Sequence, residues 1–293
     1  MDYLIKSVTH NGHFRAYLTD MSDLVRKAAE IHHSSPDATT VLGRALIATA
    51  LTGTSLLKGS DQIHVAINGR GPIGQIVTET NAQAQLRGYV TNPQASVAKR
   101  ADGQPNVPVL VGLNGSLRLT KVQPGLEPYT GEVALTTGEI GDDFTYYLAQ
   151  SEQIPSAVGV SVFVNSKNLV ERAGGFLIQT MPGASDNELD LLEQHLGRVP
   201  NISSMLAEGL QAEQIFAKFF GQIKMTILDK ISVTLAAPLP KKWYADALGT
   251  LPKTELTAMI AEDHGAEIVD RFNGHKYQFS EEELKQILAA RKE

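Results

Sequence analysis

Hydrophobic residues alternate with polar residues along much of the first two-thirds of the chain, and this pattern restricts the fold more than any other. Ile63, Val65 and Ile67 follow it, and residues 158–164 repeat it with four valines. In an extended strand every second side chain lies on the same face, so these runs predict strands with one buried face. Two helical patterns interrupt them. Runs of strands with a few helices predict an α+β fold rather than repeating βαβ units.

The period changes at Met181, where the sequence becomes helical. Ser185 and Glu188 form a capping-box pair, which predicts the start of a helix. A later predicted helix, Ala212–Phe220, carries four large apolar side chains on one face: Ile215, Phe216, Phe219 and Phe220. This stretch therefore predicts a helical linker whose aromatic face must pack against another part of the chain.

The C-terminal part is expected to form a small α/β module. The alternating residues 231–235 predict its first strand, the Asn273-Gly274 pair predicts a hairpin turn, and a capping box at Ser280 predicts its last helix. Its expected core is Leu235, Leu239, Trp243, Leu248, Leu256, Met259, Ile260, Ile268, Val269, Phe272, Tyr277, Phe279, Leu284 and Ile287. We therefore predict an N-terminal sheet-plus-helix domain (residues 1–180), a helical linker (181–230) and a C-terminal module (231–293).

Composition narrows the function. The 26 basic and 32 acidic side chains give a net charge of −6, so we expect no electrostatic attraction to nucleic acid and no nucleic-acid partner. No stretch of eighteen apolar residues predicts a membrane span, and the first residues do not resemble a secretory leader. We therefore expect a cytoplasmic protein with no membrane partner. The chain has no cysteine, which excludes disulfides, thiolate nucleophiles and Cys-ligated metals.

One glycine-rich stretch invites an enzymatic interpretation. Residues 69–74 (GRGPIG) match the GxGxxG spacing of dinucleotide sites, where the loop must open a helix whose N–H groups meet the pyrophosphate. Residues 75–81 instead predict a strand, so we expect the glycines to shape a turn or bulge. Glu139, Asp142 and Asp143 could form paired carboxylates, but acids also collect at helix N-termini for electrostatic reasons. An enzyme using this loop and these acids is the weakest of three hypotheses.

Several longer strings occur along the chain in a fixed order. They are Asn68–Ile76 (NGRGPIGQI), Leu86–Pro93 (LRGYVTNP), Tyr129–Val133 (YTGEV), Thr137–Phe144 (TGEIGDDF), Ala173–Gln179 (AGGFLIQ) and Pro182–Ala184 (PGA). Together they closely resemble the 33 kDa redox-regulated heat-shock chaperonin family of bacteria, over essentially the whole chain.

The resemblance implies an ATP-independent holdase, which captures unfolding proteins and prevents their aggregation. In that family the C-terminal module binds zinc through a CxC pair and a CxxC pair. Oxidation of these thiols ejects the metal, unfolds the module and linker, and uncovers apolar surface for clients. Family members form homodimers on activation.

The family's four zinc ligands would fall on Ala237, Leu239, Asp270 and Asn273 in this sequence. Alanine and leucine offer no donor atom, and one carboxylate with one amide cannot complete a tetrahedral site. We therefore expect no zinc, although His264 and His275 could in principle contribute to a rebuilt site. Structural zinc can supply about 10–16 kcal/mol to the folding of a small domain, which apolar contacts such as those of Leu239 would have to replace.

The leading hypothesis is a metal-free and thiol-free holdase. The client-binding candidates are the linker residues Ile215, Phe216, Phe219 and Phe220. Heat or another stress that unfolds the module would replace oxidation as the trigger. The alternative is a constitutively open binding module that has lost its gate.

Overall fold

The computed structural model describes residues 2–165 and 167–291, which form two compact units. The first unit extends to Leu235 and the second begins at Ala236. Helices and strands are mixed in both units, so the α+β prediction is confirmed. Among the described residues no helix is long and apolar enough to cross a membrane.

The first sheet, sheet A, has five strands with antiparallel neighbours throughout. In spatial order they are β10 (Met225–Ser232), β1 (Tyr3–Thr9), β2 (Phe14–Asp20), β9 (Val170–Thr180) and β8 (Ser156–Val164). The valine-rich run 158–164 is thus a strand, as predicted, and it lies at one edge of the sheet.

The second sheet, sheet B, has six strands. In spatial order they are β11 (Thr234–Leu235), β5 (Gln85–Val90), β4 (Ile76–Asn81), β3 (Gln62–Asn68), β6 (Ser116–Val122) and β7 (Tyr129–Ala134). Only the short β11 runs parallel to its neighbour. Ile63, Val65 and Ile67 of β3 are all buried, which confirms the face predicted from their alternation.

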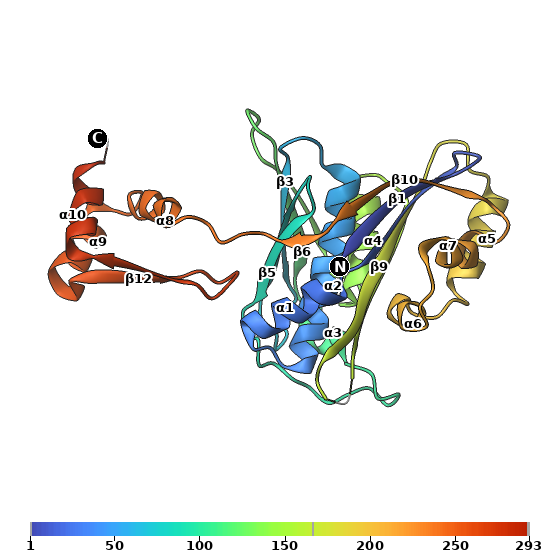
Figure 1. Cartoon of the computed structure of the whole chain (residues 1–293), viewed down its shortest axis with the longest axis horizontal. Helices are drawn as coiled ribbons and strands as arrows, with labels where there is room; N and C mark the ends of the chain where they lie inside the picture. Colours follow the sequence, from blue (N-terminus) through green and yellow to red (C-terminus); the bar gives the residue numbers. More distant parts are fainter. Residues whose placement is uncertain (1, 166, 292–293) are drawn as a thin grey trace. The chain divides into compact units, whose positions relative to one another are not determined.

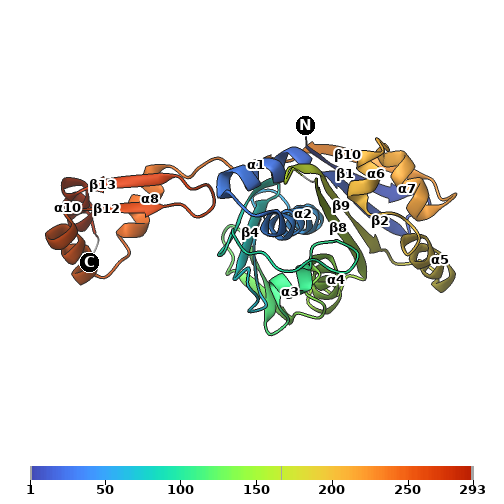
Figure 2. The same cartoon turned by 90° about the horizontal axis from the view of Figure 1, so that it is seen from below.

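A long helix, α2 (Pro36–Leu56), lies between the two sheets and packs on strands of both (Figure 2). The side chain of Ser35 caps it by accepting a hydrogen bond from the Ala38 N–H, and the helix interior is buried almost all round. Its short alanines and threonines allow this close packing. The remaining helices of this layer are α1 (Ser22–His32), α3 (Val107–Val111) and α4 (Ile140–Gln150).

Three linker helices cover the other face of sheet A (Figure 1). They are α5 (Asp186–Leu196), α6 (Ile202–Ala207) and α7 (Ala212–Phe220). The capping box at Ser185 and the bounds of α7 match the sequence predictions. The linker is therefore packed into the first unit, and the chain returns from it into sheet A as β10.

The alternating run 231–235 does not open the last module. Ile231 lies in β10 of sheet A, and Leu235 lies in β11 of sheet B. Both pack against the core of the first unit, because their strand partners β1 and β5 come from that unit. Alternation identified the strands, but alternation alone cannot identify the sheet to which a strand belongs.

The second unit contains a hairpin packed with short helices. Its elements are α8 (Lys241–Leu248), α9 (Lys253–Ala258), a π-helical turn η1 (Met259–Asp263), β12 (Gly265–Val269), β13 (Lys276–Ser280) and α10 (Glu281–Ala289). The hairpin around Asn273-Gly274 and the capping box at Ser280 are as predicted.

The core of the second unit is small and differs in part from the predicted one. Its buried hydrophobic side chains, among the described residues, are Tyr244, Leu248, Leu256, Tyr277, Phe279 and Leu284. Trp243 is 51% exposed and Val269 is 48% exposed, so both were wrongly assigned to the core. In α8 the inward face is formed by Tyr244 and Leu248, which lie four residues apart, and this places the preceding Trp243 outside.

Candidate functional site

The aromatic face of the linker is completely covered. Ile215, Phe216 and Phe219 are each at most 1% exposed, and Phe220 is 4% exposed. All four lie on α7 and point into a cluster between the linker helices and sheet A. They are therefore brought together as predicted, on one face of one helix.

The surface beneath α7 is a second apolar face, on sheet A. Alternate residues of β2, namely Phe14, Ala16 and Leu18, form its centre, with Ile5 and Ile178 on the flanking strands. The Phe14 and Phe220 rings lie 5.7 Å apart. Sequence reasoning did not identify this face, although the alternation in residues 14–18 was a usable signal.

Few hydrogen bonds hold the middle of the linker to the sheet. The Ser203 N–H donates to Ser161 Oγ of β8 at 2.7 Å, and Arg172 Nε donates to the Leu206 carbonyl at 3.3 Å. Within the linker, the His195 ring nitrogen Nδ1 lies 3.0 Å from the Phe219 carbonyl. Most of the contact between the linker and sheet A is therefore apolar burial.

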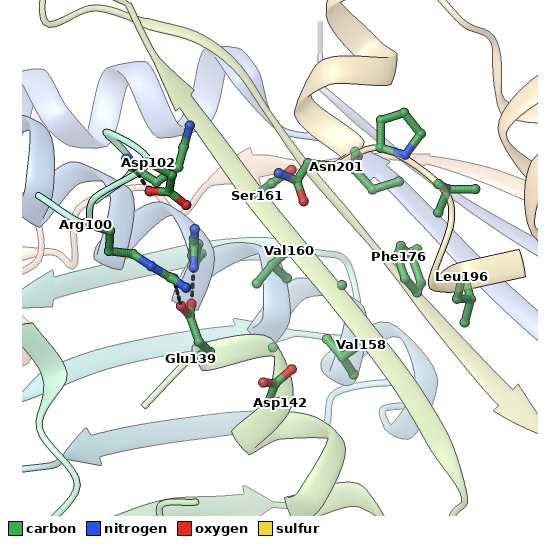
Figure 3. A pocket seen from close by; sticks show the side chains of 17 residues that line it. Arg100, Asp102, Glu139, Asp142, Val158, Val160, Ser161, Phe176, Leu196 and Asn201 are labelled. Atoms are coloured by element: carbon green, nitrogen blue, oxygen red, sulfur yellow. Dashed lines mark hydrogen bonds and ion pairs between the residues drawn. The ribbon is translucent and has the colours of Figure 1, made fainter. Parts of the chain in front are cut away.

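A cleft of about 480 Å³ lies where the linker loop between α5 and α6 meets the edge of sheet A (Figure 3). On one side Glu139 forms ion pairs with Arg44 and with Arg100, the latter at 2.9 Å. Burial raises the pKa of Asp142 on the same wall, and the nearby Glu139 raises it further. Leu196 and Phe176 form the apolar opposite side.

The acids considered for catalysis have structural partners. Asp143 is buried and accepts hydrogen bonds from the N–H groups of Thr136 and Thr137, so it fixes the turn before α4. Glu139 is held between two arginines. These contacts give both carboxylates a structural role, so their presence does not require a catalytic one.

The glycine-rich loop packs against backbone. It connects β3 to β4, so a strand follows it, as predicted. The Gly71 N–H donates to the Val111 carbonyl at 2.9 Å, and a Cβ on Gly69 or Gly71 would meet backbone oxygens within 2.4 Å. Glycine is needed here for close approach of two backbone segments.

In the second unit, the four vacated ligand positions do not offer the donor set of a zinc site. Ala237 is exposed, and Leu239 packs its hydrocarbon side chain against the unit's core. Asp270 is buried, and its carboxylate accepts hydrogen bonds from the Phe272 N–H at 2.8 Å and from Asn273 Nδ2 at 2.6 Å. The two polar residues thus bind each other.

Direct contacts connect the two parts of the chain that carry these positions. Tyr277 Oη donates to the Leu239 carbonyl at 2.5 Å, and the Tyr277 ring stacks on Tyr244 with centroids 4.2 Å apart. His264 lies 3.3 Å from Glu281, and the His275 ring packs edge-on against Tyr277. In the described part of the chain, no three His, Asp or Glu side chains are grouped so that they could hold a metal ion.

Comparison with known proteins agrees with this architecture. The family model described as "Hsp33 protein" matches residues 2–280. The 33 kDa chaperonin of Limosilactobacillus fermentum is 49% identical over 99% of both chains, and that of Levilactobacillus brevis is 47% identical over 98% of this chain and 97% of its own. The crystal structure of the Thermotoga maritima 33 kDa chaperonin aligns with a TM-score of 0.89 at 30% identity, covering 98% of this chain and 97% of the other.

Proposed function

The chain belongs to the Hsp33 family and is a chaperone, and we propose that it acts as an ATP-independent holdase that binds unfolding proteins and prevents their aggregation. One observation carries this proposal. Two apolar faces, that of α7 and that of sheet A, cover each other across a contact made mainly of hydrocarbon. If the linker is released, both faces become accessible to apolar segments of a client.

We propose that the resting protein is closed and that warming opens it. The four aromatic-face residues are buried, which favours a gated chaperone over a constitutively open binding module. The absence of cysteine removes the thiol oxidation on which the family's redox switch depends. Temperature acts instead on the stability of the second unit and of the linker.

The size of the second unit supports a thermal trigger. Among the described residues its core has six buried hydrophobic side chains, which is few for a unit without a metal centre. The donor chemistry at residues 237, 239, 270 and 273 does not suit zinc, so the proposed chaperone has no resident metal. We also propose that it works in the cytoplasm as a non-enzymatic protein and forms a homodimer when active.

Light scattering of an aggregation-prone client tests the holdase proposal. The chaperone is added without nucleotide, either kept at ambient temperature or warmed beforehand. We expect suppression near equimolar ratio only after warming, together with a rise in the fluorescence of a dye that binds apolar surface. Failure to suppress aggregation in either form would refute the proposal. Full suppression and dye binding at ambient temperature would instead support the constitutively open alternative.

A further inference from the structure

The turn between β1 and β2 contacts both ends of the helical linker. We refer to residues 10–13 as the β1–β2 tip. The His10 N–H donates to the Lys224 carbonyl at 2.9 Å, where the linker ends and β10 begins. The Met181 N–H donates to the His13 carbonyl at 2.8 Å, where β9 ends and the linker begins. One four-residue turn therefore touches the entrance and the exit of the linker.

A linker carboxylate adds a side-chain contact to the same tip. Glu188, in the first turn of α5, accepts a hydrogen bond from Asn11 Nδ2 at 2.8 Å. The His13 ring nitrogen Nδ1 lies 2.8 Å and 3.0 Å from its two carboxylate oxygens. The side chains of His13 and Glu188 are 29% and 22% exposed, so water reaches the pair but does not surround it.

Glu188 also starts its own helix. Its Oε2 accepts hydrogen bonds from the Ser185 N–H at 2.9 Å and from Ser185 Oγ at 2.8 Å, while the Glu188 N–H donates back to Ser185 Oγ. This is a capping box, so one carboxylate both caps α5 and attaches it to the tip. Undocking of the linker and fraying of α5 are coupled through that side chain.

We propose that the β1–β2 tip is an autoinhibitory clasp, in which Asn11 and His13 hold Glu188 and keep the linker closed over the apolar faces. This inference rests on the proposed function, because it assigns the contact that resists opening. The clasp is peripheral and partly hydrated, so its contribution to the closed state is small. It lies beside the backbone hydrogen bonds that join both ends of the linker to the tip, so its loss weakens the attachment of α5 next to these points.

Glu188→Gln separates the clasp from the cap. Glutamine is accepted at this capping-box position, so the bonds to Ser185 can persist, but the charge facing His13 is lost. Hydrogen exchange of the α5 amides is measured in the full chain, below the temperature of activation. We expect about two- to fivefold faster exchange in Glu188→Gln, the range that corresponds to one partly exposed contact of a carboxylate.

Two further variants make the assignment specific. Asn11→Ala removes the second donor without touching α5, and it should accelerate exchange in α5 in the same direction. Glu193→Gln removes an exposed carboxylate from the same helix, and exchange should stay at the wild-type rate. Both clasp variants should also protect a client at a lower temperature than the wild type.

The outcomes separate this proposal from the holdase proposal. Unchanged α5 exchange in both Glu188→Gln and Asn11→Ala overturns the clasp, whether or not the wild type protects clients. An equal acceleration in Glu193→Gln also overturns it, because the effect would then be general to the charge of the helix. Faster exchange in the clasp variants alone supports the clasp even if no form of the chain suppresses aggregation, a result that would refute only the holdase function.

Discussion

At the residue scale, Asp270 organises the hairpin where the family's zinc ligands would fall. Its side chain accepts two hydrogen bonds, and its carbonyl accepts a third from the Gly274 N–H at 2.7 Å. The Asn273 side chain accepts in turn from the His275 N–H at 2.7 Å. A hydrogen-bonded turn thus provides local order that does not depend on a metal.

Asp270→Ala should destabilise the second unit. The substitution leaves two partly buried donors of the turn unpaired, at a cost toward the lower end of about 1–3 kcal/mol. The only tryptophan in the sequence, Trp243, lies in this unit, so its fluorescence follows unfolding of the unit within the full chain. The exposed Asp263→Ala is the control and should change stability by no more than about 0.5 kcal/mol. Equal stability of both variants would show that the turn does not support the unit.

The pH dependence of linker docking should depend on Glu188. The Ser185 N–H and the nearby His13 ring lower the pKa of Glu188 to about 2, from an ordinary value of 4.5. A lowered pKa in the folded state means that this carboxylate stabilises the capped and docked α5 above pH 4.5 and loses its effect as the pH falls toward 2. The protection of α5 amides relative to their intrinsic exchange rate should therefore fall over this range in the wild type, and less steeply in Glu188→Gln. Parallel pH profiles would contradict this assignment.

At the element scale, α7 buries its whole apolar face between the linker helices and sheet A. Phe219 approaches Phe176 with ring centroids 4.7 Å apart, while Phe216 is fully buried beside them. Only Lys218 and the other outward side chains of this helix meet solvent. Docking of α7 therefore depends on a few large side chains, and truncating one of them should reduce the free energy of docking substantially.

Phe216→Ala should lower the temperature at which the linker opens. Truncating a buried phenylalanine removes contacts and leaves a cavity, at a typical cost of about 3–5 kcal/mol. Dye binding during a temperature ramp measures the opening, and Lys218→Ala on the exposed side of α7 is the matched control. An unchanged opening temperature in Phe216→Ala would mean that release of α7 is not the event that exposes the apolar surface.

Sequence patterns predicted where helices and strands lie better than they predicted which strands pair with each other. The capping box at Ser185 and the amphipathic stretch 212–220 are local signals, so the helices they predict were placed correctly. The pairing of β10 with β1 joins residues more than two hundred positions apart, and no local pattern encodes it. For the same reason the strand at Leu235 was assigned to the wrong unit.

At the scale of the whole molecule, the sequence predicted one of the two apolar faces of the candidate site and missed the other. The face of α7 was visible because four large apolar residues recur at helical spacing. The complementary face of sheet A was missed, because it comes from three strands whose order only the fold reveals. The β1–β2 tip was missed as well, since Asn11 and Glu188 are far apart in the sequence and neither is unusual in its local context.

In the proposed function, packing replaces the metal–thiol centre, so that warming and not oxidation opens the chaperone. The most direct test is the temperature at which the full chain begins to suppress client aggregation, measured untreated, with hydrogen peroxide and with a zinc chelator. We predict the same activation temperature in all three conditions. Activation by peroxide at ambient temperature, or a chelator-induced fall in the activation temperature, would contradict the account.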